Sequence, residues 1–535
     1  MKRLLACAAF GAMLMTSPLS APSAAWAETP ADQLIVAWTL NNVLTMDPAA
    51  ITGSETVAVL NNLYDTLAQL DPETNELIPR MAESWEFSDD NMKVTFKLRE
   101  GVKFASGNPL TAEDVAYSLK RALLLNLPSS SNLKSRGFLP EDADKYFVAE
   151  DETTFVMNLP QQDDPKILIM ELTQAGAGSI VDSKLVMENE VDGDWGNAWL
   201  TNNSAGSGGY VLTQWRSNEY IILTRNENYW GEMPEMARVL IRHLPESQSQ
   251  RLALQQGDID LAYSLAAPDL AALQEEEGIT IETVPSAGFY YLAVSMKDER
   301  FANQKVREAL RYLIDYDGVN SAVMPFYGVK HQGPLNSGVF GAIEEPGYTL
   351  DVEKAKALLA EAGYPDGFDT TLRVISEQHF LDAATAIQGT LAQAGINAEI
   401  ITGDGGQIYG AMRERNFELL VGRGGGGQIP HPESNLRAMA FNPDNADEAK
   451  LTNYQGWRTS FYDEKLNDMI GTALLETDQD KQRAMYEEVQ HYMADLVMSI
   501  QPFSERVVTA AYQSDVSGVI VNPWVSRFEG VEKDR

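Results

Sequence analysis

The stretch that decides the fold is MAESWEFSDDNMKVTFKLREGVKFASGNPLTAEDVAYSLKRAL, residues 81–123. Apolar and polar side chains alternate strictly over Val94–Leu98, which is typical of a half-buried strand. Gly107-Asn108-Pro109 then breaks the chain. Thr111 and Asp114, three residues apart, have the spacing of an N-terminal capping box. The order therefore predicts a turn at 88–91, a strand, a glycine turn and a capped helix.

The first 27 residues have the features of a secretory signal. Lys2 and Arg3 supply a positive start, Leu4–Met15 is apolar, and Ala25-Trp26-Ala27 fits the small-x-small cleavage pattern. The apolar run is too short to span a bilayer comfortably. We therefore expect cleavage before Glu28 and a mature protein outside the cytoplasm.

Charge and cysteine content exclude several functions. Removing residues 1–27 changes the formal net charge from −36 to −38, because Lys2 and Arg3 are lost and no acidic residue is. Such a field repels nucleic acid and anionic membrane surfaces, so we expect neither as a partner. Cys7 is the only cysteine. A mature chain without a thiol has no disulfide, cysteine-bound metal or cysteine nucleophile.

Beyond the opening stretch, strands and helices alternate, which indicates an α/β fold. The pattern predicts strands at 34–38, 153–159, 210–216, 220–225, 239–244, 261–263, 280–284, 289–294, 370–375, 398–401 and 417–421, and helices at 54–67, 247–256, 268–276, 304–314, 352–362, 381–394, 407–415, 466–474 and 479–496. Two last strands, at 497–502 and 507–512, return the chain to its first half. We expect two lobes around a cleft, where ligands commonly bind and hinge motions close.

Five segments resemble the family 5 extracellular solute-binding proteins. Besides residues 81–123 they are Gly206–Tyr210, Asn226–Gly231, Phe289–Leu310 and Asp351–Pro365. The second is similar to a family "GtGPY" element, with Gly209 in place of the usual proline, and the third to a family "rNpdYWg" turn. Tyr229 and Trp230 in that turn are expected to pack rather than to touch a ligand.

The resemblance implies a two-lobed fold of the type II periplasmic binding protein class, with an extra subdomain in the first lobe. Lobe I would comprise 28–286 and 504–535, with the subdomain at about 71–205, and lobe II would comprise 287–503. It also implies a monomeric periplasmic receptor of an ABC importer that passes a small polar solute to a membrane permease and its ATPase. Peptides, modified peptides, opines and glycoside-like solutes fit that class, and no cofactor is expected.

A glycine loop after the strand at 417–421 is the segment expected to face the cleft. Gly422, Gly424 and Gly427 satisfy G-x-G-x-x-G, but a dinucleotide site needs a helix directly after the loop, and Pro430 and Pro432 disfavour one. Close backbone approach to a ligand is one reason for such a loop, and simple flexibility is the other. The residues expected to bind the ligand are Asn41, Tyr290, His379, Arg423, Gly425, Gly426, Gly427, Gln428, His431 and Trp457.

This loop departs from the peptide-binding pattern. In peptide receptors of the family the loop resembles W-x-x-D-x-x-D-P, whose first aspartate holds the α-amino group of the peptide. Here that position falls at or near Gln428, and no carboxylate lies between Glu418 and Glu433. A free-amine peptide is therefore in doubt. Arg423 is a candidate for binding an anionic group, because a guanidinium can hold a carboxylate or phosphate through two hydrogen bonds.

Three alternatives remain. His431 suggests a metal-chelate receptor, although the five histidines do not have the close spacing of metal ligands. An oligosaccharide receptor of the same fold is the second alternative. A sensing or chaperone module would use the same cleft. An enzyme is disfavoured: Ser131–Lys134 matches S-x-x-K, but the companion S-D-N and K-T-G triplets are absent and the context predicts a loop rather than a helix start.

Overall fold

The computed structural model describes residues 29–535 except residues 52, 264, 345, 427 and 428. The predicted signal peptide therefore lies outside the described residues, as do Gly427 and Gln428 of the glycine loop. Within the described ranges, no helix is both long and apolar enough to cross a membrane.

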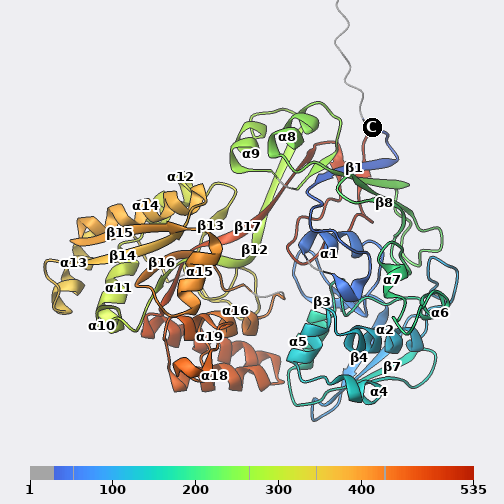
Figure 1. Cartoon of the computed structure of the whole chain (residues 1–535), viewed down its shortest axis with the longest axis horizontal. Coiled ribbons are helices and arrows are strands. Elements are labelled where there is room, and N and C mark those ends of the chain that lie inside the picture. The colour runs from blue at the N-terminus through green and yellow to red at the C-terminus, as the bar shows by residue number, and fades with distance from the viewer. Residues whose placement is uncertain (1–28, 52, 264, 345, 427–428) are drawn as a thin grey trace, which may run out of the picture.

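The chain forms two α/β lobes (Figure 1). Lobe I, at the right of the figure, contains β1 (Gln33–Trp38), α1 (Ser54–Leu60), β2 (Ala68–Leu70), β3 (Leu77–Pro79), β4 (Ala82–Phe87), β5 (Lys93–Leu98), α2 (Ala112–Leu125), α3 (Ser130–Ser135), α4 (Ala143–Tyr146), β6 (Phe147–Ala149), β7 (Thr154–Asn158), α5 (Pro165–Glu171), α6 (Ser183–Glu188), α7 (Asn197–Leu200), β8 (Tyr210–Arg216), β9 (Tyr220–Arg225), β10 (Arg238–His243), α8 (Ser247–Gln255), β11 (Leu261–Ala262), α9 (Ala267–Leu273), β18 (Val516–Ser517) and β19 (Glu532–Lys533). Lobe II contains α10 (Glu299–Ala302), α11 (Gln304–Tyr312), α12 (Tyr316–Ala322), β13 (Gly328–Lys330), α13 (Val352–Glu361), β14 (Phe368–Ile375), α14 (Gln378–Gln393), β15 (Ile396–Gly403), α15 (Gly405–Arg413), β16 (Leu419–Gly424), α16 (Pro432–Met439), α17 (Gln455–Arg458), α18 (Glu464–Leu475) and α19 (Gln479–Leu496). β12 (Ile279–Val294) and β17 (Ile500–Gln513) belong to both.

The opening stretch forms the elements that its sequence predicts. The Asn91 amide donates to the Ser88 carbonyl in the turn between β4 and β5. The apolar side of β5 is fully buried, and α2 starts at a complete capping box in which the Thr111 amide donates to Asp114. β4 and β5 continue into an antiparallel sheet of order β4-β5-β7-β6, which forms the extra subdomain of lobe I and has its own apolar core.

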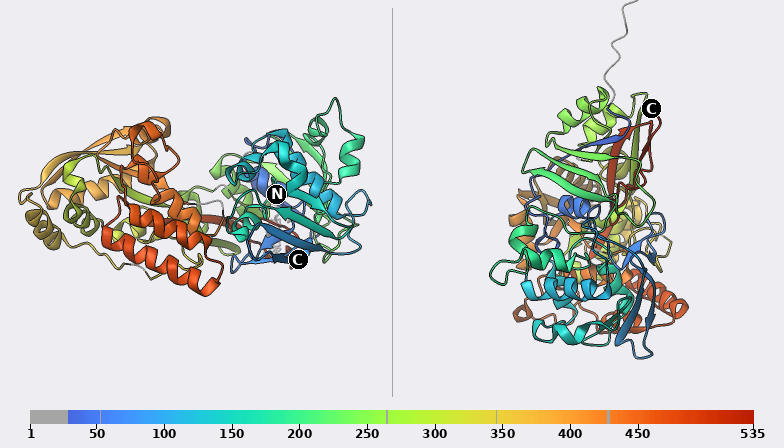
Figure 2. Two further views of the ribbon diagram at one scale, coloured as in Figure 1. Left: turned by 90° about the horizontal axis from the view of Figure 1, so that it is seen from below. Right: turned by 90° about the vertical axis from the view of Figure 1, so that its right-hand side faces the viewer.

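One sheet joins the two lobes, in the order β15-β14-β16-β12-β17-β11-β1-β10-β9-β8. β12 and β17 form an antiparallel pair along nearly their whole length. At the lobe I end Ile279 is opposite Gln513, and at the lobe II end, beside β16, Ala293 is opposite Ile500. Figure 2 shows the lobes connected through this region. The prediction of four separate strands here is wrong. The strands expected at 280–284 and 289–294 are one strand, because β12 continues through Pro285 with a register shift before Phe289.

Each lobe has its own apolar core on either side of the shared strands. The lobe II core gathers side chains from α11, α14 and the surrounding strands, and the lobe I core gathers side chains from β1, β10 and the C-terminal tail. Burial of apolar surface is the main stabilising term in folding. Because the two cores are separate, β12 and β17 are the strands that pass from one to the other.

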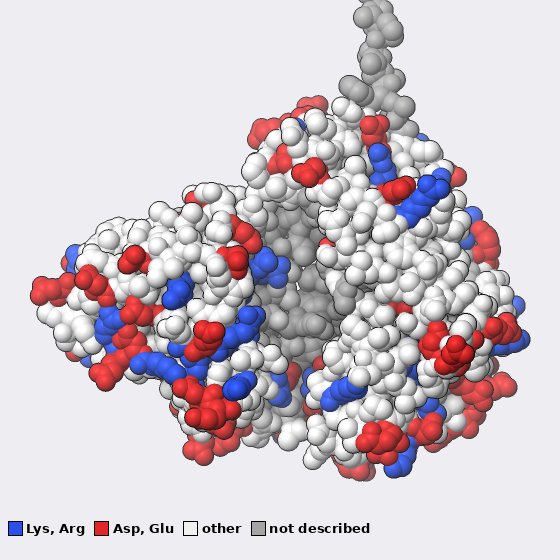
Figure 3. All heavy atoms as spheres, in the orientation of Figure 1, with Lys and Arg blue, Asp and Glu red and all other residues white. Residues whose placement is uncertain are grey.

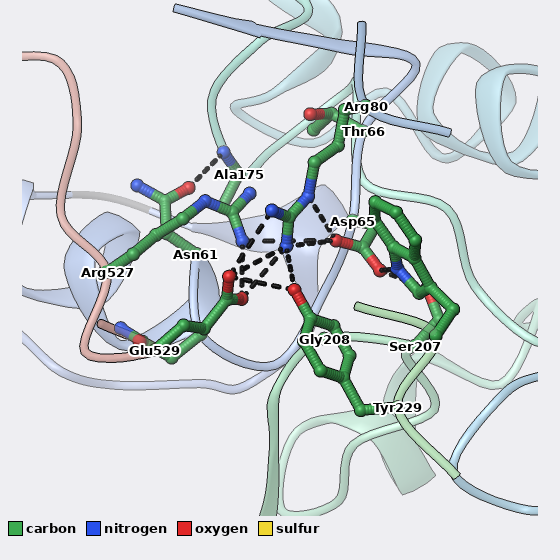
Figure 4. Close-up of polar contacts among 12 residues, drawn as sticks. Asn61, Asp65, Thr66, Arg80, Ala175, Ser207, Gly208, Tyr229, Arg527 and Glu529 are labelled. Atoms are coloured by element: carbon green, nitrogen blue, oxygen red, sulfur yellow. Dashed lines mark hydrogen bonds and ion pairs between the residues drawn. The ribbon is translucent and has the colours of Figure 1, made fainter. Parts of the chain in front are cut away.

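A buried ion network fastens the C-terminal tail to lobe I (Figure 4). Arg80 donates to Asp65 at 2.7 Å and to Glu529 at 2.8 Å. The Tyr229 hydroxyl donates to Glu529, and the Trp230 indole donates to Asp65, so both aromatic residues have the packing role expected from the sequence. Burial alone would raise the pKa of Glu529, but the Arg80 and Arg527 guanidinium groups outweigh burial and lower it to about 2. Glu529 is therefore a carboxylate at neutral pH.

Replacing Arg80 tests this network. Arg80→Met leaves two carboxylates buried without their main cation, and breaking a buried ion pair in this way costs about 3–5 kcal/mol. We expect a clear loss of unfolding free energy in urea denaturation followed by circular dichroism. Lys305→Met, which removes an exposed ion pair with Glu361, is the control and should leave the midpoint almost unchanged. Equal midpoints for the two variants would show that the network does not stabilise the fold.

Candidate functional site

The surface is hollowed between the two lobes, and basic side chains stand along the left-hand edge of the hollow (Figure 3). A cavity of about 590 Å³ lies there, between α1, the segments 128–132 and 174–177 and the C-terminal tail on the lobe I side and Ile429 of lobe II. Ala287 of β12 and Arg506 of β17 form its floor. A volume of this size is typical of small-ligand sites.

A second cavity, of about 400 Å³, lies beside the first and shares Val57, Gln174, Pro523 and Trp524 with it. Its lining is mostly aromatic and apolar, with the uncharged polar residues Asn61, Gln174, Thr509, Asn522 and Ser526 among the rest. Trp38 and Tyr263 have ring centroids 4.6 Å apart, and Tyr327 and Trp524 add two further rings. Among the described residues that line it, none carries a charge. This part of the cleft suits the flat or apolar body of a ligand.

Three of the residues expected to bind the ligand lie together on the lobe II wall. Tyr290 on β12 pairs with Arg423 on β16, and the His379 ring packs edge-on to Tyr290 at 5.7 Å. The His379 ring also stacks on Tyr327, at 4.2 Å between centroids. Burial lowers the pKa of His379, so the imidazole is neutral at neutral pH. These three predicted residues therefore lie together in lobe II, although none of them is among the described residues that line the two cavities, and their role in binding stays a prediction.

Arg506 was not predicted, yet it belongs to this cluster. It is half-buried on β17, lines the larger cavity and donates to the Ala287 carbonyl at 3.3 Å. Burial lowers its pKa, Tyr290 partly offsets this, and the positive charge of Arg423 lowers it further. The two guanidinium groups therefore repel each other across β12. Arg423 itself is exposed and lies over the Phe380 ring at 5.8 Å.

Other predicted residues lie apart from this cluster. Trp457 is buried in lobe II, where its indole donates to the Ala446 carbonyl and Arg415 covers its ring. Asn41 is exposed in the turn after β1. Neither lines the two cavities.

His431 has a structural role in the part of the chain that the structure describes. It is the N-cap of α16, and its Nδ1 accepts from the Glu433 amide. Burial, together with the positive charges of Arg136 and Lys166, lowers its pKa to about 3. The prediction that prolines disfavour a helix here is wrong, because Pro432 occupies the first turn of α16, where proline is favoured.

Backbone packing explains the described part of the glycine loop. A Cβ on Gly426 would lie 2.2 Å from the backbone nitrogen of Gly288, and a Cβ on Gly425, whose φ is +77°, would lie 2.7 Å from Met439. The Asn435 side chain fixes the loop further by donating to the Gly425 carbonyl at 2.8 Å. The loop is therefore packed against the register shift of β12.

The S-x-x-K motif lies on α3, although the sequence predicted a loop there. The Ser131 hydroxyl donates to the Pro128 carbonyl at 2.7 Å, and the Lys134 ammonium donates to the Asn126 side chain. An activated serine needs a base within hydrogen-bond reach, and here each group has another partner. Within the described ranges, no group of three or more His, Cys, Asp or Glu side chains is placed to hold a metal ion.

The fold and the cleft define a class of protein: a two-lobed receptor that holds a solute between lobes joined by paired strands. A family model described as bacterial extracellular solute-binding proteins, family 5 Middle, matches residues 76–447. The chain belongs to this family, as the sequence resemblance implied. Its fold class and its solute-binding role are thereby confirmed.

Relatives are similar over nearly the whole chain. The protein named "Probable D,D-dipeptide-binding periplasmic protein DdpA" of Escherichia coli K12 is 26% identical, covering 94% of each chain. Heme-binding protein A of Haemophilus influenzae is 26% identical, covering 95% of this chain and 94% of its own. The solved structure of HbpA2 from Haemophilus parasuis is 22% identical, with a TM-score of 0.81 over 94% of this chain and 100% of that one. At that identity the structural likeness concerns the fold alone.

A substitution tests the packed glycine loop. Gly426→Ala places a Cβ against the backbone of Gly288, so the loop or β12 must shift. We expect a loss of about 1–3 kcal/mol in unfolding free energy, the usual cost of overpacking. Gly410→Ala on α15, where nothing lies within 4 Å, is the matched control and should be neutral or slightly stabilising. A Gly426→Ala protein as stable as the control would mean that the loop is loose.

Proposed function

We propose that this protein captures a small polar solute in the periplasm and delivers it to the permease and ATPase of an ABC importer. The observation that carries the proposal is the hollow between the lobes, which holds two adjoining cavities of small-ligand size on the pair of strands that connects the lobes. The periplasmic relatives support the compartment. A cleaved signal at 1–27, a monomeric state and the absence of catalysis belong to the same proposal.

The lobe boundaries at 286/287 and 503/504 are proposed as the hinge. The boundary at 286/287 lies within the register shift between Pro285 and Phe289 of β12. The boundary at 503/504 in β17 lies opposite the second shift, between Tyr290 and Tyr291 of β12. Irregular strand segments absorb backbone rotation more easily than regular ladders, which suits a hinge. Closure would bring the wall with Tyr290 and Arg423 toward α1 and Trp524.

Polar contacts across the base of the cleft support a closing motion. The Gln482 side chain of lobe II donates to Asp164 of lobe I at 3.1 Å, and Arg136 lies 3.8 Å from Glu433. Burial raises the pKa of Asp164. These contacts join the extra subdomain to α16 and α19, so in the proposed motion they hold one end of the cleft while the other end opens.

The solute need not be a peptide with a free amino group. Relatives are named for D,D-dipeptides, heme and glutathione, so solute chemistry varies widely among proteins of similar sequence. The segment from Leu419 to Pro432 contains no carboxylate that could hold an ammonium group. Modified peptides, opines and glycoside-like solutes fit better, and a metal-chelate or oligosaccharide receptor is the second candidate of the same fold.

A thermal-shift screen of the mature protein, residues 28–535, against peptides, opines, oligosaccharides and metal chelates tests the proposal. A bound solute at a hundred times its Kd stabilises the folded state by about 2.7 kcal/mol, so a binder should raise the Tm clearly. Small-angle scattering with the same compound should show a smaller radius of gyration. Trp524→Ala should weaken binding at least tenfold, and Tyr462→Ala, an exposed aromatic of lobe II, should not. Turnover of the compound would contradict the proposal.

A further inference from the structure

Two arginines, Arg423 on β16 and Arg506 on β17, lie on the two strands that flank β12, and neither has a carboxylate partner among the described residues. Tyr290 on β12 pairs with Arg423 on one side and with Ser504 of β17 on the other, and Arg506 follows two residues later. Among the described residues, neither Arg423 nor Arg506 forms an ion pair closer than 4.0 Å, although the chain has 77 acidic residues and 41 basic ones. Both guanidinium groups therefore retain donors for another partner.

Two buried arginines elsewhere in the described part of the chain, Arg121 and Arg307, have several partners each. Arg121 binds both oxygens of Asp47, at 2.8 and 2.6 Å, and Arg307 donates to four backbone carbonyls. These arginines hold the fold together. Arg506 has one carbonyl contact, with Ala287, and Arg423 has a ring contact, with Phe380. These contacts do not account for placing two like charges on the two strands that flank β12.

Two like charges that act on each other are stabilised by an anion that binds both. Of these two, Arg506 lines the larger cavity and Arg423 is exposed on β16. Repulsion between Arg423 and Arg506 costs free energy in the empty cleft, and a carboxylate or phosphate between them would replace that repulsion with charge-assisted hydrogen bonds. The chain as a whole carries a formal net charge of −36. Two arginines without carboxylate partners among the described residues are therefore not a consequence of the overall composition, which is acidic.

The remaining cleft lining offers no comparable site for a cation. In the larger cavity Glu171 is the one carboxylate among the described lining residues, and Arg136 holds it at 2.7 Å. A neighbouring cavity toward the base of the cleft adds Asp163 and Glu433. Arg136 binds Asp163, and Arg437 binds Glu433. Each of these three acidic groups is thus paired with an arginine, Arg136 serving two of them, whereas Arg423 and Arg506 have no carboxylate within 4.0 Å among the described residues.

We propose that the solute is an organic anion with an apolar or aromatic body. Arg423 and Arg506 bind its carboxylate or phosphate group, and the cavity lined by Trp38, Tyr263 and Trp524 holds the body. The inference rests on the proposed function, solute capture in this cleft, and it adds the chemical class. It also accounts for the missing ammonium anchor, because an acid held by its anionic end needs no carboxylate in the glycine loop.

The test is a panel of matched compounds measured by thermal shift and calorimetry on the mature protein. Each aromatic body, indolyl, naphthyl or N-acetyl-dipeptidyl, is presented as a carboxylic acid, its primary amide, its amine and its phosphate monoester. We expect acids or phosphates to give the largest rise in Tm, and the amide of the same body to bind at least tenfold more weakly. Comparing the carboxylic acid with the phosphate monoester of the same body shows which of the two anionic groups the site binds more tightly.

Two variants locate the site. Arg423→Gln and Arg506→Gln should each weaken binding of the best acid at least tenfold, and the Tm without ligand should not fall, because one of two repelling charges has gone. Lys356→Gln on α13 also removes one positive charge, but from an exposed position, and this variant should bind the acid like the parent protein. If amines or amides bind best, the proposed anion site is wrong, but the proposed function of solute binding still holds. A panel without any binder overturns both, and unchanged affinity in both arginine variants overturns the assignment of these residues.

Discussion

The antiparallel pairing of β12 with β17 is the constraint on which the rest of the structure depends. These two strands pass from one apolar core to the other, and their ladder is continuous except at two register shifts midway. At the first shift, Gly288 and the glycine loop pack backbone against backbone, so the loop position is tied to the connection between the lobes. The same shifts bring Arg506 and Tyr290 to the cleft. The connection between the lobes, the proposed hinge and the proposed binding wall therefore all depend on this one pair of strands.

A second principle is the division of charge. The acidic residues give the protein a strongly negative field, which favours solubility and repels anionic polymers. Several buried acidic groups are paired with arginines, as Asp65 and Glu529 are with Arg80. The cleft reverses this arrangement, because its two arginines lack carboxylate partners among the described residues. A solute that brings a negative charge would complete the pairing, so the site and the fold obey the same electrostatic rule.

Local sequence patterns predicted the elements that depend on local physics. Strict alternation fixed β5, the Thr111–Asp114 box fixed the start of α2, and helical periodicity fixed α19 at its observed bounds. The continuity of β12 was missed because Pro285 resembles a strand end, and only pairing with a segment some 220 residues away carries the strand through it. Arg506 was missed for the same reason: nothing near it in sequence marks a site. Arg423 was predicted from its place beside the glycine loop and from guanidinium chemistry. Tyr290 and His379 came from family resemblance, which also proposed Trp457, a residue that packing places in the interior of lobe II.

The most direct test of the central claim is a crystal structure of the mature protein with the compound that stabilises it most. The account predicts ligand density in the hollow between the lobes, on the floor formed by β12 and β17, in contact with Trp524 of lobe I and with the wall that carries Tyr290 of lobe II. Density confined to another surface, such as the outer face of α18, would contradict the account, as would a complex in which no residue of β12 or β17 lies near the ligand.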